Sequence, residues 1–332
     1  MEKIKRFIEN KINIGGLKKF AVIIGETPSQ GARSPKLWNN AYRAFNKKCK
    51  MYPIDVYEKN LENLIIELKK DKRFIGGSVT APYKEKIIKY LDGISPESKK
   101  IGSINTLIKK NNKIFGENTD YYGALNSLKQ FSNKKNILVF GCGGAGKSVI
   151  LACMKQFKSC SLKVYNRDKK KILRFTKNLK NKNAIRIISS HNYIKKISRL
   201  DLIINTTSVG FDSWVRKQKK YKNLKFFNPI SNIKKLVYSK KKNEREFVNK
   251  NLRIINKNLI ETYKFLSQNS NASVFDIIYN PSLTQLINHA KTYGMRTING
   301  LEMNLYQAIK AFKIVNNIQN ENKIRIAMIK NG

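Results

Sequence analysis

The stretch GCGGAGKS, at 141–148, carries residue types suited to binding phosphate. Gly141, Gly143 and Gly146 match G-x-G-x-x-G, the turn that holds a dinucleotide pyrophosphate at a helix N-terminus. Gly141 and Gly146, together with Lys147 and Ser148, match the phosphate loop of ATPases and GTPases. Both patterns need a preceding strand, here NILVF, and a following helix. The stretch alone therefore leaves hydride transfer and phosphoryl transfer open.

The end of the next expected strand, VYNRD, bears on the choice of cofactor. An NAD-selective fold places Asp or Glu there for the ribose 2′-hydroxyl, whereas an arginine suits a 2′-phosphate. Asn166 and Arg167 therefore favour NADP(H). Asp168 follows directly, and a carboxylate at that place keeps NAD(H) as an alternative.

Lys84 in SVTAPYKE and Asp120 in GENTD are candidates for proton transfer. A lysine can act as acid or base when a carboxylate orients it, but sequence patterns do not show that the two meet. The chain has only two histidines, His191 and His289, and we expect structural roles for both. Four cysteines occur without C-x-x-C or metal-ligand spacing, so we expect reduced thiols and no metal site.

Composition limits the class of protein. With 332 residues, the chain is long enough for two ordinary domains. Its formal net charge of +45 makes a nucleic-acid-binding protein one hypothesis. Basic residues are spread along the whole chain, so we favour a compositional origin and expect no specific nucleic acid. The chain lacks a long apolar run and the apolar core of a secretory signal, so we expect a cytoplasmic protein without membrane association.

The residues singled out above lie between alternating strand and helix signals. Apolar runs of strand length, such as KFAVIIG at 19–25, alternate with amphipathic runs of helix length. This alternation predicts α/β layers with parallel strands. The stretch IGSINTLIKKNNKIFGENTD predicts two strands joined by a polar turn. Near the end of the chain, Ser282 is the expected N-cap of the helix in SLTQLINHAKTYG.

We therefore predict an α/β fold, with an N-terminal α/β substrate domain followed by a Rossmann-type doubly wound NADP-binding domain. An N-terminal extension is expected at 1–18. The substrate domain is expected at 19–122, with 300–332 returning to it, and the dinucleotide domain at 123–299. Residues 212–271 interrupt the alternation with a large excess of lysine and arginine, so we expect a basic, partly helical, solvated insertion there.

The order and rough spacing of several motifs resemble the shikimate dehydrogenase family. These motifs are SVTAPYKE, INTL, GENTD-x-x-G, GCGGAGK, NR, DLIINTTSVG, VFDIIYNPSLTQL and NG-x-E-M-x-x-x-Q-A. They cover about 19–210 and 273–315. The resemblance implies reduction of 3-dehydroshikimate to shikimate, in aromatic amino acid biosynthesis, by direct hydride transfer from NADPH and without a metal. It also implies two domains that hold substrate and cofactor across a cleft.

The resemblance also implies roles for individual residues. Lys84 would be the catalytic lysine and Asp120 its partner, and together they would hold and protonate the carbonyl oxygen. The residues implied to bind substrate are Ser34 and Tyr279, near the carboxylate, and Thr80, Asn105 and Gln307, at the ring hydroxyls. Those implied to bind the cofactor are Gly141, Gly143, Gly144, Ala145, Asn166, Arg167, Thr207, Ser208 and Gly300.

The sequence departs from the family around the expected substrate carboxylate. The family usually has His-Ser-x-Ser-Pro, whose two serines grip that group. Here SQGARSP keeps Ser34 but places Ala32 at the first serine, which leaves Ser29 or Arg33 as other donors. Further departures expected near the substrate pocket are Trp38, Ser78 and Tyr121.

Several alternatives follow from these observations. The altered carboxylate end keeps open a quinate/shikimate-type or other cyclic hydroxy-acid dehydrogenase. The phosphate-loop match keeps open a nucleotidase, and the charge keeps open a nucleic-acid-binding protein. Because the second strand ends in Asn-Arg and the flanking domain carries the lysine and aspartate, we favour the dinucleotide turn, with Lys147 facing solvent. A small-molecule substrate is expected, and the oligomeric state is left as monomer or homodimer.

Overall fold

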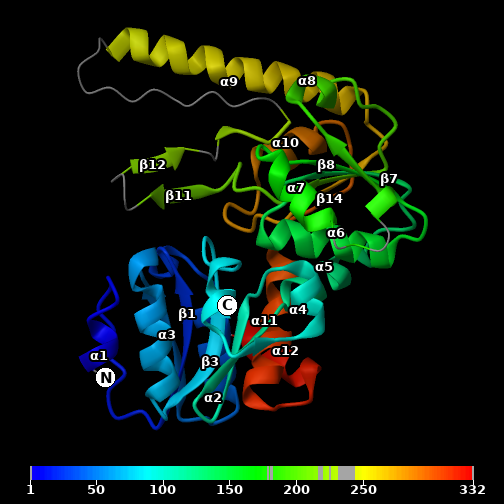
Figure 1. Ribbon diagram of the computed structural model, residues 1–332. Helices are drawn as coiled ribbons and strands as arrows, with labels where there is room; N and C mark the ends of the chain where they lie inside the picture. Colours follow the sequence, from blue (N-terminus) through cyan, green and yellow to red (C-terminus); the bar gives the residue numbers. More distant parts are fainter. Residues whose placement is uncertain are drawn as a thin grey trace. The chain divides into compact units, whose positions relative to one another are not determined.

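Two compact units make up the chain (Figure 1). Unit 1 comprises Met1–Ser127 and Met303–Gly332, and unit 2 comprises Leu128–Glu302. Each contains a six-stranded sheet with helices packed against it, which confirms the predicted α/β class. The computed structural model describes residues 2–177, 179, 182–215, 220–223, 226–230 and 244–330.

The sheet of unit 1 is mixed and has the order β2-β1-β3-β5-β6-β4. The first strand pairs in parallel with the second and third, as the alternation of elements predicts. The hairpin of β5 and β6 then adds antiparallel pairs, because a two-residue turn can join only antiparallel strands. The strands are β1 (Lys19–Gly25), β2 (Cys49–Asp55), β3 (Phe74–Val79), β4 (Gly93–Ile94), β5 (Thr106–Lys110) and β6 (Lys113–Glu117).

Helices cover both faces of this sheet because side chains alternate along its central strand. On β1, Phe20, Val22 and Ile24 face a core shared with α3 (Leu61–Lys70). The intervening Ala21 and Ile23 face a second core, formed with three other helices. These are α2 (Ser34–Ala44), α11 (Leu301–Asn316) and α12 (Glu321–Ile329). The remaining helices of this part are α1 (Glu2–Lys5), α4 (Pro96–Ile101) and α5 (Asp120–Leu128).

The N-terminal segment packs on the first of these cores and also reaches the outer edge of β2. Ile4 and Ile14 are buried there. Asn10 donates from Nδ2 to the Pro53 carbonyl at 2.9 Å, and its Oδ1 accepts from the Asp55 amide at 2.7 Å. The Glu9 amide donates to the Asp55 carbonyl. The segment therefore satisfies backbone groups that an edge strand would otherwise expose.

The sheet of unit 2 is wholly parallel and has the order β14-β13-β10-β7-β8-β9. Starting from β7, the chain adds strands first on one side and then on the other, which is the doubly wound order of dinucleotide-binding folds. The strands are β7 (Asn136–Phe140), β8 (Ser161–Tyr165), β9 (Ile185–Ile188), β10 (Leu202–Asn205), β13 (Ser273–Asp276) and β14 (Thr297–Ile298). The helices are α6 (Gly144–Gln156), α7 (Lys169–Thr176), α8 (His191–Ile194), α9 (Glu244–Ser267) and α10 (Gln285–Lys291).

The expected insertion at 212–271 contains part of the core of unit 2. A hairpin of β11 (Asp212–Val215) and β12 (Lys220–Asn223) precedes α9, and residues 216–219, 224–225 and 231–243 lie outside the described part of the chain. Phe265 and Leu266, near the end of α9, are buried with residues of β7, β10 and β13. This end of α9 is the crossover between β10 and β13, so the expectation of a solvated excursion is wrong for it.

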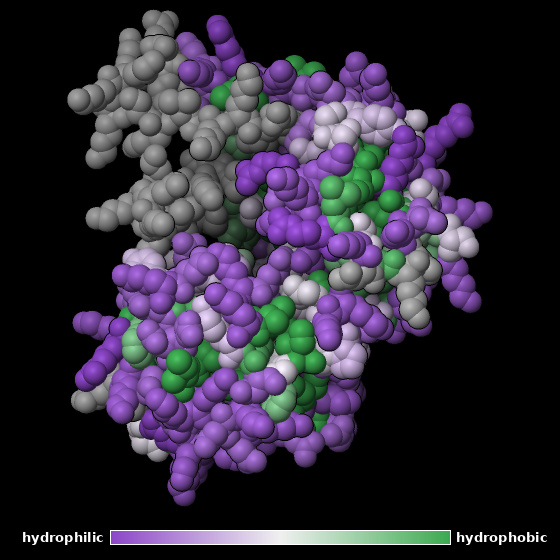
Figure 2. All heavy atoms as spheres, viewed as in Figure 1, coloured by the Kyte–Doolittle hydropathy of each residue, from purple (hydrophilic) through white to green (hydrophobic). Residues whose placement is uncertain are grey.

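Hydrophilic residues are spread over the visible faces of both units, with smaller apolar patches among them (Figure 2). This distribution matches the even spread of lysine along the sequence. Among the described residues, none of the helices combines the length and apolar character needed to cross a membrane.

Candidate active site

A buried polar array in unit 1 joins Lys84, Asp120, Asn105 and Gln307. Lys84 Nζ donates to Asp120 Oδ2 at 2.6 Å. Asn105 Nδ2 donates to Asp120 Oδ1 at 3.0 Å and to Gln307 Oε1 at 2.9 Å. The structure thus brings together two residues expected to transfer protons and two expected to bind substrate.

The array is also partly shielded from water. The side chain of Lys84 is 20% exposed and that of Asp120 is 8% exposed. An ion pair at this depth interacts more strongly than a surface pair, and it positions both charged groups within a limited volume. A lysine amine held by a carboxylate at this depth is an arrangement that can take part in proton transfer.

The fold places these residues at one end of the sheet. Lys84 follows β3, Asn105 directly precedes β5, and Asp120 begins α5 after β6. Gly123, one turn into α5, lets that helix approach α11 closely, because a Cβ there would lie 2.5 Å from the Met303 carbonyl oxygen. This close approach sets Gln307 against Asn105.

Two further residues expected to bind substrate lie in unit 1. Thr80 directly follows β3, and its amide donates to the Ile24 carbonyl at 2.8 Å. Ser34 is the first residue of α2 and is 5% exposed. Tyr279 belongs to unit 2 instead, where it follows β13 and is half-buried.

The four positions that depart from the family have different environments. Ala32 packs beside the core between α2 and α11. Trp38 is fully buried in that core, with its ring 5.2 Å from the ring of Phe312. Its expected place near the substrate pocket stays a prediction. Ser78 is buried within β3, and Tyr121 is the second residue of α5.

In unit 2, the glycine turn follows β7 and leads into α6. Gly141 has φ +102°, and a Cβ on it would lie 2.5 Å from Thr206 Oγ1. Gly143 is the N-cap of α6 and has no heavy atom within 4 Å of the place where a Cβ would stand. Gly144 and Ala145 are the first residues of the helix. The turn therefore leaves space at Gly143 for a ligand to approach the backbone at a helix N-terminus.

Lys147, the lysine of the phosphate-loop match, was expected to face solvent, and this expectation is wrong. It lies in the first turns of α6 and is only 9% exposed. A lysine can bury its aliphatic stem along apolar surface while its charged end stays at a polar boundary. Ser148 is fully buried and donates to the Gly144 carbonyl at 3.2 Å.

The residue that follows β8, the next strand after the glycine turn, is hydrogen-bonded to the turn itself. Asn166 Oδ1 accepts from the Cys142 amide at 3.0 Å. Asp168 Oδ1 accepts from the Lys170 amide at 3.0 Å and so caps α7. Arg167, between these two residues, is exposed. Asp168 thus has a structural role as the cap of α7, and both Arg167 and Asp168 are exposed at this strand end beside the turn.

A second loop at the same end of the sheet follows β10. The Asn205 Oδ1 atom accepts from the Thr207 amide at 3.0 Å and from Thr207 Oγ1 at 2.7 Å. Ser208 is exposed at the tip of the loop. Thr206 Oγ1 donates to the Phe140 carbonyl at 2.7 Å, which ties this loop to the end of β7.

Sequence reasoning missed the buried network beneath this loop. Asp276 Oδ1 accepts from Asn205 Nδ2 at 3.0 Å, and its Oδ2 accepts from Thr284 Oγ1 at 2.7 Å. Thr284, rather than the expected Ser282, is the N-cap of α10, because its hydroxyl accepts from the Ile287 amide. The signal available in the sequence was that two apolar strands end in Asn and Asp.

Burial raises the pKa of Asp276 to about 6, although its hydrogen bonds to Thr284, Ile278 and Asn205 favour the ionised form. The ordinary pKa of this carboxyl is 3.8. Below about pH 4 the carboxyl is therefore protonated in both the folded and the unfolded state, and the folded state keeps its full stability. That stabilisation is lost as the pH rises through about 6, and a shift of this size corresponds to about 3 kcal/mol.

The Asp276→Asn protein should lack this dependence, because its side chain stays uncharged. Between about pH 4 and pH 7, the free energy of unfolding of the wild type should fall relative to that of the variant by up to about 3 kcal/mol. Urea unfolding followed at several pH values measures this difference. A difference that stays constant across the range would contradict the assignment.

The remaining residues of interest in unit 2 have structural contacts. Gly300 is buried, and its amide donates to the Ile278 carbonyl at 3.0 Å. His191 Nδ1 shares a hydrogen bond with the Tyr165 hydroxyl at 2.6 Å, and the ring of His289 lies 5.0 Å from that of Tyr263. Burial lowers the pKa of both histidines. No group of three or more His, Cys, Asp or Glu suited to a metal ion occurs within the described residues.

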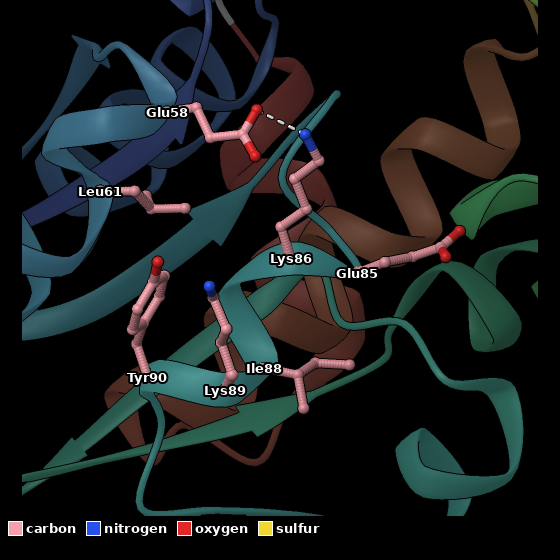
Figure 3. A pocket seen from close by; sticks show the side chains of 7 residues that line it. All are labelled: Glu58, Leu61, Glu85, Lys86, Ile88, Lys89 and Tyr90. Carbon is pink, nitrogen blue, oxygen red and sulfur yellow. Dashed lines mark hydrogen bonds and ion pairs between the residues drawn. The ribbon is translucent and has the colours of Figure 1, made fainter.

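A separate pocket of about 410 Å³ lies on unit 1 (Figure 3). An ion pair between Lys86 and Glu58 crosses its upper part, while the side chain of Glu85 points away from that pair. Lys84 lies directly before Glu85 in the sequence but does not line the pocket. The lining residues are Glu58, Leu61, Glu85, Lys86, Ile88, Lys89 and Tyr90.

Known proteins resemble this chain in sequence and in fold. The shikimate dehydrogenase substrate binding domain matches residues 23–107. The chain is 33% identical to the shikimate dehydrogenase (NADP(+)) of Methanosphaera stadtmanae over 298 residues, which cover 88% of this chain and 89% of that protein.

Solved structures show the same likeness. The shikimate dehydrogenase of Aquifex aeolicus is 27% identical, with a TM-score of 0.69 over 96% of this chain and 100% of that chain. The Thermus thermophilus shikimate 5-dehydrogenase, in complex with NADP(H) and shikimate, shares the fold at 21% identity, with a TM-score of 0.70 over 94% of this chain and 99% of that chain. The identity to the Methanosphaera protein extends through both units, and on this ground the chain belongs to the shikimate dehydrogenase family.

Proposed function

We propose that the chain is an NADP-dependent shikimate dehydrogenase that reduces 3-dehydroshikimate to shikimate. The observation that carries the proposal is the contact of 2.6 Å between Lys84 Nζ and Asp120 Oδ2, inside a buried array of amide side chains. In this proposal unit 1 binds the substrate and unit 2 binds the cofactor. Asn105, which is hydrogen-bonded to Asp120, and Gln307, which is hydrogen-bonded to Asn105, bind the ring hydroxyls together with Thr80.

The glycine turn fits a dinucleotide. Gly143 has open space where a side chain would stand, and α6 begins there without a capping side chain. Backbone N–H groups at such a helix end favour a pyrophosphate. The neighbouring Asn166 and Arg167 are the residues that would hold the adenosine phosphate. Thr207, Ser208, Gly300 and the residues Gly141, Gly144 and Ala145 complete the proposed cofactor site.

In this proposal, the protein's own residues supply the proton that the carbonyl oxygen takes up during the reduction. NADPH, when bound, supplies the hydride that reaches the substrate carbonyl carbon. Lys84 donates a proton to the carbonyl oxygen as negative charge develops there. Asp120 holds the lysine in place through Oδ2, and Asn105 in turn holds Asp120 through Oδ1. In the reverse direction the same lysine accepts the proton of the shikimate hydroxyl.

A direct assay tests the proposal. Purified protein is mixed with shikimate and either NADP⁺ or NAD⁺, and the absorbance of the reduced nicotinamide is followed. We expect turnover with shikimate and a higher kcat/KM with NADP⁺. Turnover with quinate in place of shikimate would instead assign the related quinate activity, which the substitution at Ala32 motivates. Absence of turnover with any of these pairs would overturn the proposal.

Replacing Arg167 with alanine should raise the KM for NADPH about tenfold or more while changing the KM for NADH little. The reason is that only NADPH carries the 2′-phosphate that a guanidinium binds through charge-assisted hydrogen bonds. Arg174→Ala is the matched control, because Arg174 is also exposed but lies in the last turn of α7. Equal changes for both cofactors would contradict the assignment of Arg167.

The remaining expectations concern partners and location. We propose a small molecule as the only substrate class, no specific nucleic-acid partner, a monomer or homodimer, and a cytoplasmic location. Basic residues occur along the whole sequence, with an excess at 212–271, and this wide spread supports the absence of a single dedicated polyanion site. The same net charge should make the binding of anionic substrate and cofactor weaker at high salt.

A further inference from the structure

We propose that Asp276 is a positioning residue for the reaction, which holds the loop after β10 in place for the cofactor through the side chain of Asn205. The inference rests on the proposed function, because it concerns the same cofactor site. Asn205 ends β10 and Asp276 ends β13, and the two residues are partners in the parallel register of these strands. Both are fully buried, so each acts through the residues that it contacts.

The order of the strands indicates which half of the cofactor this loop would face. The proposed pyrophosphate turn follows β7, and Asn166 and Arg167, proposed for the adenosine phosphate, follow β8 on one side of it. On the other side of β7 stands β10. A dinucleotide lies across the carboxyl ends of such strands, so its nicotinamide half would extend toward the loop that carries Thr207 and Ser208.

The side chain of Asn205 determines the shape of this loop. Its Oδ1 accepts from the Thr207 amide at 3.0 Å and from Thr207 Oγ1 at 2.7 Å. Its Nδ2 donates to the Val209 carbonyl at 3.0 Å, and the Val209 amide donates to Thr207 Oγ1 at 3.1 Å. The single proton of the Thr207 hydroxyl is thus donated inward, to Asn205. A nicotinamide would therefore meet the backbone of the loop and the exposed Ser208 rather than that proton.

Asp276 fixes the orientation of the Asn205 amide. Asn205 Nδ2 donates its second proton to Asp276 Oδ1 at 3.0 Å. An ionised carboxylate only accepts hydrogen bonds, whereas the Thr207 amide only donates them, so the two ends of the Asn205 side chain cannot exchange places. Without the acceptor at Asp276, a buried N–H of Asn205 would lose its partner, and the side chain would shift to regain one. The loop that depends on this side chain would shift with it.

Asp276 is itself anchored on its other side. Its Oδ1 also accepts from the Ile278 amide at 3.1 Å, and its Oδ2 accepts from Thr284 Oγ1 at 2.7 Å. Thr284 is fully buried and is the N-cap of α10. The carboxylate therefore connects the loop after β10 with both ends of the segment 278–284, which includes Tyr279. One side chain thus positions a loop proposed for the cofactor and a segment proposed for the substrate.

The test compares Asp276→Ala with the conservative Asp276→Asn at about pH 8, where the wild-type carboxyl is ionised. Alanine removes the acceptor, so we expect hydride transfer to slow about ten- to a hundredfold, the range for a small misplacement of reacting groups. The KM for NADP⁺ should change less than about threefold, because the pyrophosphate turn is left intact. Asparagine still offers an oxygen to Asn205 and Ile278, so it should keep most of the wild-type rate.

The first turnover separates positioning from a loss of folded protein. When enzyme is mixed with saturating shikimate and NADP⁺, the rate constant of the first turnover does not depend on the folded fraction, whereas its amplitude does. Positioning by Asp276 predicts a lower rate constant in Asp276→Ala, and a merely structural role predicts a lower amplitude alone.

Asn269→Ala is the matched control for this measurement. Asn269 is a buried amide at the opposite ends of the same two strands, where it accepts from the Leu200 amide at 3.1 Å and donates to the Ile197 carbonyl at 2.9 Å. Its replacement should destabilise unit 2, since buried backbone groups lose their partners. The rate constant of the first turnover should nevertheless stay at the wild-type value.

A double-mutant cycle tests the route through Asn205. Asn205→Ala should lower the same rate constant by a similar factor, and adding Asp276→Ala to it should cause little further loss. If Asp276→Ala does not fold, Asp276→Val, which fills more of the same space without an acceptor, takes its place. A wild-type rate constant in the Asp276 variant, or losses that multiply in the double variant, would overturn the inference while the proposed function stands. If the wild type does not oxidise shikimate, the proposed function fails first and the inference falls with it.

Discussion

Replacing Lys84 with alanine should lower kcat for shikimate oxidation by about a hundred- to ten-thousandfold, the usual range for removing a positioned acid or base. The affinity for NADP⁺ should stay near that of the wild type, because the proposed cofactor residues lie in unit 2. The loss is expected because Lys84 is the proposed proton donor to the substrate. Among the described residues, the other side chain bonded to Asp120 is the amide of Asn105, which cannot donate a proton at neutral pH. Steady-state kinetics and a binding titration with NADP⁺ measure the two quantities.

Lys86→Ala provides the matched control for this experiment. Lys86 lies two residues further along, and it is 47% exposed and paired with Glu58 rather than with Asp120. Its removal should leave kcat within about twofold of the wild type, as expected for an exposed ion pair. Asp120→Asn should give an intermediate loss, because the amide can still contact Lys84 but no longer balances its charge. If Lys84→Ala kept most of the turnover, the lysine would not be the proton donor.

Replacing Gly141 or Gly143 of the proposed cofactor turn with alanine should have different effects. The first change should lower the stability of unit 2, and the second should weaken the binding of NADP⁺. Gly141→Ala should destabilise unit 2 by about 3 kcal/mol or more, because the new Cβ would meet Thr206 Oγ1 and the residue has φ +102°. Gly143→Ala should change the free energy of unfolding by less than about 0.5 kcal/mol, since its φ is −85° and no atom stands within 4 Å.

The Gly143→Ala protein should nevertheless bind NADP⁺ about tenfold or more weakly, because its methyl group would occupy the space through which a pyrophosphate approaches the backbone. Urea unfolding and a binding titration separate the two effects. Unchanged affinity for NADP⁺ would move the pyrophosphate away from this turn. An unfolded Gly143→Ala protein would contradict the open space that the structure shows there.

The strands near the proposed sites were the most predictable part of the fold. KFAVIIG predicted β1 at the bounds that the structure gives, because a buried parallel strand reads as a short apolar run between polar residues. The antiparallel hairpin of β5 and β6 was also visible, from its polar KKNNK turn. The sequence did not predict α12, whose role depends on its packing against α2.

Packing at long range explains most of the errors. Lysine content predicted a solvated segment at 212–271, but Phe265 and Leu266 are buried with residues of β7 and β10, which lie far away in sequence, and of the nearby β13. A lysine in the first turns of a helix usually faces water, yet Lys147 is buried. In each case the burial of the side chain depends on tertiary packing, which the local sequence pattern does not show.

The candidate site, too, was predictable only in part from the sequence. Motif order identified Lys84, Asp120, Asn105 and Gln307, and the structure joins them by hydrogen bonds. Asn304 carried no signal in the sequence, although its carbonyl accepts from Gln307 and its side-chain oxygen accepts from Arg33, about 270 positions earlier in the chain.

The contacts of Asn10 with the outer strand of unit 1 also limit how copies of this chain can associate. A strand edge with open N–H and C=O groups can pair with another molecule and extend into a dimer or an aggregate. At Pro53 and Asp55 those groups are already hydrogen-bonded within the same chain. A second copy therefore has no backbone partner at this end of β2, and a homodimer would have to form through side-chain contacts or at a different edge.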